Sequence, residues 1–264
     1  MKNILVPVGS SKNAASHLQY AVDFAKAFGA KLFVVQVYNV YTKAGTMIKV
    51  DQILERESQG YLKKQIAKID TKGVEVITRT LKGKLIDTLE LACKAAEIDL
   101  VLIEPRTNSV KDEVYLGKTS GKIIKQMQVP TLIVPEGYVF KPYSQILMAI
   151  KSAIIKKEGV LNPLKTIKEK FNSAVDLLLV KTHYYNEGDF DVNDELSTLV
   201  GNITKTENPT TYLGVLEHYR EYNPDMLCVV RRKRGFFTQM WENNTILKKD
   251  FSSSLPVLVL SGMK

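Results

Sequence analysis

The chain has 264 residues and a formal net charge of +9; 45 % of its residues are hydrophobic and 25 % are charged. This balance is typical of a folded globular protein and excludes a disordered, collagen-like or disulfide-scaffold chain. Its two cysteines exclude a zinc site made of four cysteines, and no apolar run reaches the ~18 residues that a membrane span requires. The apolar run at 4–8 is too short for a secretory signal, so we expect a cytoplasmic protein.

Short apolar runs alternate with amphipathic helical stripes along the first half, which is the pattern of βα units around a parallel sheet. The first run, 4–8, is continuous, as expected for a strand buried on both faces. Gly29 stands where a left-handed residue would end the helix that follows. The expected strands of this half are 4–8, 32–37, 74–80, 100–103 and 131–134, and the expected helices are 18–28, 45–70, 85–96 and 117–128.

The same pattern begins again after residue 140. The expected strands are 146–150, 177–180, 210–213, 226–230 and 257–260, with helical stripes at 161–171 and 192–203. Asp99 and Asp225 open matching strands 126 residues apart, and Pro130 and Pro256 precede matching strands at the same offset. The sequence therefore predicts two equivalent domains, 1–140 and 141–264. The fold class is α/β, with two tandem doubly wound five-stranded parallel sheets.

Several segments follow one another in a characteristic order. They are KNILVPV at 2–8, AKAFGAKL at 25–32, DLVLI at 99–103, and Leu116-Gly117 followed thirteen residues later by PTLIV. In this order and spacing they resemble the universal stress protein family in its tandem two-domain form. The resemblance implies Rossmann-like domains, a role in stress response, and a last strand in each domain that mediates domain or subunit pairing.

Nucleotide-binding members of that family carry an aspartate at the end of the first strand and a late Gly-x2-Gly-x9-Gly-Ser/Thr motif. The glycines of such a motif let backbone N–H groups approach phosphates at a helix N-terminus. In this chain the aspartate position holds Gly9 in the first half and Lys151 in the second. Glu104 replaces the first motif glycine, and Lys118 replaces the final Ser/Thr. The resemblance therefore implies weak binding of ATP or none, and we expect no resident cofactor.

Two segments of the first half leave alternatives open. The turn at 9–11 follows the first strand, where open α/β sheets bind ligands, and is either an anion site or a plain turn. The segment 117–119 either holds a phosphate at a helix start or simply opens the helix. It is no Walker A loop, because Asp112 stands where that loop requires glycine. A single nucleotide pocket would use Gly9, Ser10, Ser11, Val37, Gly117, Lys118 and Thr119, with Val37 near the base by family analogy.

A basic cluster with two adjoining phenylalanines follows the fourth strand of the second half. It consists of Arg231, Arg232, Lys233 and Arg234. Such a cluster can hold phosphate groups or a nucleic-acid backbone, or it is simply solvated. Since the remaining positive charge is spread thinly, nucleic acid is the less favoured partner. The three histidines show no metal-ligand spacing, and the apolar surroundings of Cys93 and Cys228 predict buried thiols.

The sequence thus predicts a non-enzymatic stress-response protein that binds a small phosphorylated ligand or protein partners. The last strands of the two halves are expected edges, and their pairing would give a homodimer or a pseudo-dimer within one chain. The alternative is a nucleotide-binding stress sensor with one working pocket in the first domain. A third possibility, an enzyme that hydrolyses an adenylated compound, is disfavoured because no nucleophile or general base with a partner can be named.

Overall fold

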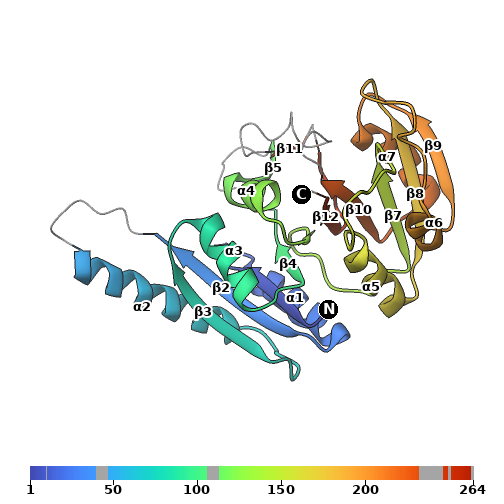
Figure 1. The fold of residues 1–264 in the computed structure, drawn as a ribbon. Helices are drawn as coiled ribbons and strands as arrows, with labels where there is room; N and C mark the ends of the chain where they lie inside the picture. Colours follow the sequence, from blue (N-terminus) through green and yellow to red (C-terminus); the bar gives the residue numbers. More distant parts are fainter. Residues whose placement is uncertain (10, 40–46, 106–112, 232–245, 249–250, 263–264) are drawn as a thin grey trace. The chain divides into compact units, whose positions relative to one another are not determined.

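The computed structural model describes residues 1–9, 11–39, 47–105, 113–231, 246–248 and 251–262 (Figure 1). By their internal contacts these residues form two compact units. Unit 1 consists of Met1–Glu104 and Glu136–Phe140, and unit 2 of Pro105–Pro135 and Lys141–Lys264. The boundary predicted at residue 140 rests on the sequence repeat, whereas these two units are defined by contacts between residues. The predicted boundary therefore stays a prediction.

Unit 1 is a parallel sheet in the order β3-β2-β1-β4, with helices between the strands (Figure 1). Its strands are β1 (Asn3–Pro7), β2 (Lys31–Tyr38), β3 (Val76–Lys82) and β4 (Leu100–Ile103), and its helices are α1 (Ala14–Phe28), α2 (Met47–Ile66) and α3 (Leu85–Ala95). β1 pairs on both sides, and Ile4, Leu5 and Val6 are at most 1 % exposed, as the continuous apolar run predicts. Gly29 ends α1 with φ 64°, the left-handed conformation that glycine adopts without strain.

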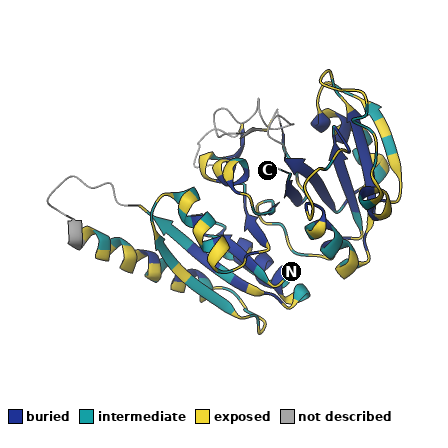
Figure 2. Ribbon diagram, in the orientation of Figure 1, coloured by how far each residue is buried: buried dark blue, intermediate teal, exposed yellow. Residues whose placement is uncertain are grey.

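Unit 2 is a sheet in the order β6-β12-β10-β7-β8-β9. Its strands are β6 (Thr131–Ile133), β7 (Gln145–Ile150), β8 (Ala174–Lys181), β9 (Ile203–Glu207), β10 (Met226–Arg231) and β12 (Val257–Ser261), and its helices are α4 (Lys118–Gln126), α5 (Asn162–Phe171), α6 (Asp194–Leu199) and α7 (Thr211–Tyr222). The central strands of this sheet are almost entirely buried (Figure 2). β6 pairs antiparallel with β12, so the two strands expected as edges are joined within one chain.

The predicted strand at 210–213 is wrong, because these residues start α7. Thr210 is the N-cap, and its hydroxyl accepts a hydrogen bond from the Leu213 N–H at 3.1 Å. The missing strand is β9, which has only β8 as a neighbour and alternates between exposed and half-buried residues. Such an edge strand lacks a continuous apolar run, so the search for apolar runs missed β9, which begins at Ile203, where the predicted helix 192–203 ends. The short antiparallel pair β5 (Val114–Leu116) and β11 (Ile246–Leu247) was also not predicted.

The predicted repeat has a counterpart in how the first and fourth strands of each half are joined. The Asp99 carboxylate accepts a hydrogen bond from the Asn3 N–H at 3.0 Å, and the Asp99 N–H donates to the Asn3 carbonyl at 2.9 Å. The Asp225 carboxylate accepts from the Gln145 N–H at 3.1 Å, and the Asp225 N–H donates to the Gln145 carbonyl at 2.8 Å. The same pair of contacts therefore secures the start of the first strand in both halves.

Asp225→Asn is expected to lower the free energy of unfolding at pH 7 by about 1–2 kcal/mol. Burial alone would raise the pKa of Asp225, but hydrogen bonds from the Lys141 ammonium and from the Gln145 and Ser144 N–H groups outweigh it and lower the pKa. A lowered folded-state pKa stabilises the protein above the unfolded-state pKa of about 3.9, and this contribution is lost as the pH falls through the folded-state value. Urea unfolding between pH 7 and 3.5 should show the two proteins converging in acid.

The control for this prediction is Asp191→Asn, since Asp191 is exposed. It should change the free energy of unfolding by less than about 0.5 kcal/mol at every pH. A difference between wild type and Asp225→Asn that stays constant from pH 7 to 3.5 would contradict the ionic origin of the effect.

Candidate functional site

The predicted anion site at the end of β1 is a closely bonded turn. The Ser11 N–H donates to the Gly9 carbonyl at 2.9 Å, and the Tyr61 hydroxyl of α2 donates to the same oxygen at 2.7 Å. The Ser11 hydroxyl accepts from the Asn13 N–H at 3.1 Å. These contacts are those of a turn leading into α1. Ser10 lies outside the described residues, and the anion-binding role of this turn stays a prediction.

A buried acid lies at the same edge of unit 1, where the strands end. Glu104 directly follows β4 and is 6 % exposed. Val37, expected near a nucleotide base, is half-buried in β2 and pairs with Leu81 of β3. A carboxylate in a region of low dielectric repels phosphate oxygens strongly. Glu104 therefore places a buried carboxyl group at the edge where the family motif would bind an anion.

The predicted phosphate-binding segment 117–119 forms the start of α4 in unit 2. Gly117 is the N-cap with φ −69°, which any residue can adopt, and its carbonyl accepts from the Gly121 N–H at 2.9 Å. Lys118 and Thr119 are exposed in the first turn. Because Gly9 and Val37 belong to unit 1 and this segment to unit 2, a pocket shared by all of them stays a prediction.

Arg231, the first residue of the predicted basic cluster, is buried at the end of β10 and only 4 % exposed. Its guanidinium donates to the Ile124 and Met127 carbonyls at the C-terminal end of α4, and to the Ser261 hydroxyl at 3.3 Å. Terminal helix carbonyls lack partners within the helix and carry partial negative charge, so a buried guanidinium suits them. These contacts give Arg231 a structural role.

The other members of the basic cluster, Arg232, Lys233 and Arg234, lie outside the described residues. Their anion-binding role stays a prediction.

The two cysteines are buried, as the sequence predicts. Burial, with a smaller contribution from Glu90, raises the pKa of Cys93 to about 12, and burial also raises the pKa of Cys228. Both thiols are therefore protonated at neutral pH and poor nucleophiles. Within the described part of the chain, no three His, Cys, Asp or Glu side chains lie close enough together to hold a metal ion. In the same residues, no helix is both long and apolar enough to cross a membrane.

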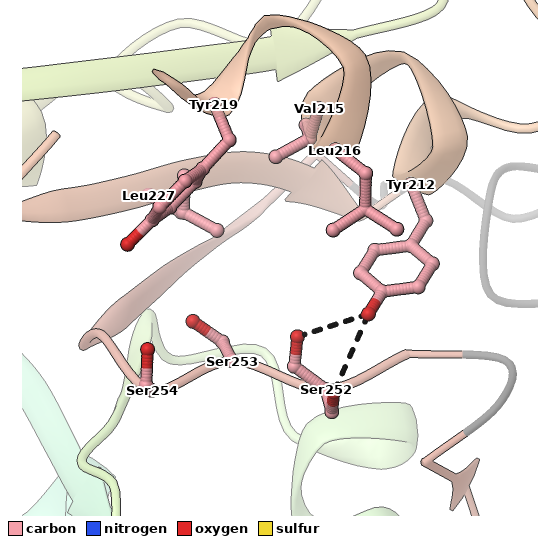
Figure 3. Close-up of a pocket in the computed structure, with 8 residues that line it drawn as sticks. All are labelled: Tyr212, Val215, Leu216, Tyr219, Leu227, Ser252, Ser253 and Ser254. Atoms are coloured by element: carbon pink, nitrogen blue, oxygen red, sulfur yellow. Dashed lines mark hydrogen bonds between the residues drawn. The ribbon is translucent and has the colours of Figure 1, made fainter. Parts of the chain in front are cut away.

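A pocket of about 280 Å³ lies beside α7 in unit 2 (Figure 3). One wall is a single face of α7, formed by Tyr212, Val215, Leu216 and Tyr219. Leu227 of β10 also lines it, and the opposite wall is the serine segment 252–254. Since 210–213 was expected to be a strand, this helix face was not recognised in the sequence. The tyrosines and apolar residues at helical spacing, and the serine run before the last strand, were the available signals.

One end of the pocket reaches the edge of the sheet opposite to the one where ligands of this fold class bind. Leu227 is the second residue of β10 and pairs with Val257, the first residue of β12. The pocket therefore reaches the amino ends of these strands, whereas open α/β sheets bind ligands at the carboxyl ends. None of the residues that line it belongs to the predicted nucleotide site.

A buried aromatic cluster supports one end of the pocket. The Phe251 ring lies 5.1 Å from the Tyr212 ring and 5.3 Å from the Tyr115 ring, measured between centroids. The Tyr212 hydroxyl donates to the Ser252 carbonyl at 3.2 Å. Burial, and secondarily the nearby Tyr212, raises the pKa of Tyr115, so its hydroxyl stays protonated. These contacts hold the Tyr212 ring in place.

Comparisons with known proteins assign the chain to a family. A model of the universal stress protein family matches residues 1–135. A universal stress protein of Methanocaldococcus jannaschii is 23 % identical over 138 residues, which are 50 % of this chain and 81 % of that protein.

The structural comparisons extend over nearly the whole chain. A universal stress protein of Archaeoglobus fulgidus superposes with a TM-score of 0.72 at 17 % identity, covering 98 % of both chains. A putative universal stress protein of Pseudomonas aeruginosa has a TM-score of 0.58 at 15 % identity, covering 99 % of this chain and 93 % of that one. These likenesses confirm the α/β, Rossmann-like fold that the sequence predicts. Because the family model covers more than half of its residues, the chain belongs to the universal stress protein family.

Proposed function

We propose that this protein acts in stress response without catalysing a reaction, through binding of a ligand or of protein partners, and that it binds ATP weakly or not at all. Membership of the family supports the stress-response role. The observation that carries the weak ATP binding is the buried Glu104 at the carboxyl end of β4. By the resemblance this position would be the first glycine of the phosphate motif. Gly9 likewise offers no carboxylate to a nucleoside.

The pairing of β6 with β12 supports a second part of the proposal, an intramolecular pseudo-dimer. Each strand supplies backbone groups that the other needs, as Thr131–Ile133 and Val257–Val259 pair residue by residue. Pairing within one chain removes the exposed edges through which two copies would otherwise associate. A homodimer through another surface is the alternative.

A thermal-shift screen with ATP, ADP, AMP and inorganic phosphate tests the ligand part of the proposal. A ligand at 100 times its Kd stabilises the folded state by about 2.7 kcal/mol, which is about 5–10 °C for a chain of this size. We expect a change below about 1 °C for wild type with 1 mM of each ligand. Glu104→Gln removes the carboxylate charge at nearly constant size and should raise the response to ATP, whereas the exposed control Glu57→Gln should not.

A rise of several degrees in wild type with ATP would overturn the proposal in favour of the nucleotide-binding stress sensor. That alternative is supported by the exposed Lys118 and Thr119 in the first turn of α4, which contains no acidic residue. Gly117→Asp would then decide the site, because a carboxylate at the helix start should abolish the response to ATP.

A further inference from the structure

The pocket beside α7 has two chemically different walls, and the described residues that form them carry no charge. Val215 and Leu216 of α7 are apolar, and Leu216 is 50 % exposed, so this wall is open to solvent. The facing segment 252–254 presents three hydroxyl-bearing side chains (Figure 3). None of the described residues that line the pocket is acidic or basic. An ion would therefore lose its hydration in this pocket without gaining a counter-charge.

The pocket is also held in shape by contacts that do not need a ligand. Tyr212 is fixed by its hydrogen bond to the Ser252 carbonyl and by the Phe251 ring. The Ser253 hydroxyl accepts from the Leu255 N–H at 3.1 Å and donates to the Leu255 carbonyl at 2.9 Å, which fixes the turn on the serine wall. Because this wall is already ordered, less conformational entropy is lost when a ligand binds to it.

The Ser254 and Tyr219 hydroxyls are available to form hydrogen bonds with a ligand. Ser254 is exposed and Tyr219 half-buried, and among the described residues neither hydroxyl has a hydrogen-bond partner. In Figure 3 both side chains lie at the same end of the pocket. A hydroxyl or amide group can therefore bond at this end while an apolar ring packs on Leu216 and Tyr212.

We propose that this pocket binds a small uncharged molecule with one aromatic ring and a hydroxyl or amide group. The volume of about 280 Å³ lies just below the usual range for drug-sized ligands, roughly 300–1,000 Å³, so a molecule of a single ring has room in it. The site is separate from the predicted nucleotide positions, so it does not depend on whether ATP binds.

Methyl NMR of the full-length chain, labelled at leucine and valine, tests the assignment with benzyl alcohol as the probe. The methyl signals of Val215, Leu216 and Leu227 should shift and saturate with a Kd of about 1 mM, as expected for a ligand of this size. Benzoate and benzylammonium have the same ring with a charge, and they should bind at least about tenfold more weakly because the lining offers no counter-charge.

Two variants of exposed leucines on α7 provide a matched pair. Leu216→Trp places an indole in the pocket and should weaken benzyl alcohol binding at least about tenfold. Leu213→Trp makes the same change at a leucine that is 43 % exposed and does not line the pocket, and it should leave the Kd unchanged. Ser254→Ala removes an exposed hydroxyl and should weaken binding about threefold to tenfold without affecting the fold.

The outcomes separate the possibilities. Saturable shifts confined to the three lining residues, lost in Leu216→Trp and kept in Leu213→Trp, support the site. Absence of saturation up to about 20 mM, equal binding of the charged probes, or equal loss in both tryptophan variants would overturn it. If Leu216→Trp lowers the melting temperature, its loss of binding is not informative, and Ser254→Ala is the deciding variant. Wild-type affinity for benzyl alcohol in Ser254→Ala would contradict the proposed hydrogen bond to the ligand.

Discussion

Arg231→Met is expected to lower the melting temperature by about 6–12 °C. The substitution leaves the Ile124 and Met127 carbonyls without the donor that now satisfies them, at a position where Arg231 itself is 4 % exposed. Unsatisfied buried acceptors that have lost a charged donor cost about 3 kcal/mol together. For a chain of this length, each kcal/mol corresponds to about 2–4 °C. Scanning calorimetry measures the effect directly.

The matched control is Arg220→Met, because Arg220 is an exposed residue in the last turn of α7. It should change the melting temperature by less than about 2 °C. Arg231→Lys should fall between wild type and Arg231→Met, since one ammonium cannot reproduce the planar fork that reaches both carbonyls. A change below about 1 °C in Arg231→Met would show that these contacts do not stabilise the fold.

Gly214→Ala is expected to destabilise the protein by about 1–3 kcal/mol, although alanine is the better helix former. Gly214 lies in α7 where the helix packs against the sheet. A Cβ atom there would stand 2.9 and 3.1 Å from the two methyl carbons of Val180 and 3.3 Å from the Thr206 methyl. Val180 is fully buried, so the helix or the strand must move. Urea unfolding measures the loss of free energy.

Gly60→Ala is the control, because it makes the same change inside α2 at a position with no atom within 4 Å of the added Cβ. It should stabilise the protein by about 0.5–1 kcal/mol. Val180→Ala should relieve the contact, so Gly214→Ala should cost less in that background than in wild type. Stabilisation by Gly214→Ala, or strict additivity of the two substitutions, would contradict the steric explanation.

Much of the fold could be predicted from local pattern. β1, β7 and β10 are buried central strands, and each is visible as a continuous apolar run. β9 was missed because an edge strand needs only one buried face, and Thr210 was misread because a threonine before an apolar residue suits both a strand and a helix cap. Local periodicity therefore finds central strands better than edges.

The candidate sites were less predictable than the fold. Arg231 was read with its three basic neighbours in the chain, but its partners in α4 are 104 and 107 residues away. The pocket needed α7 to be recognised as a helix and the segment 252–254 to be placed beside it. Neither the distance along the chain nor the type of residue tells which of these segments contact each other in the fold.

By itself the sequence determined the family, the α/β class and the repeated strand openings at Asp99 and Asp225, because each depends on local composition and on fixed spacing. Only the tertiary structure decided that β6 pairs with β12, that Arg231 caps α4, and that α7 and the serine segment enclose a pocket. These features depend on contacts between segments that lie far apart in the sequence. The separation is more than a hundred residues for the strand pair and for Arg231, and 40 residues between Tyr212 and Ser252 in the pocket. Such contacts are set by packing of the whole unit rather than by any local pattern.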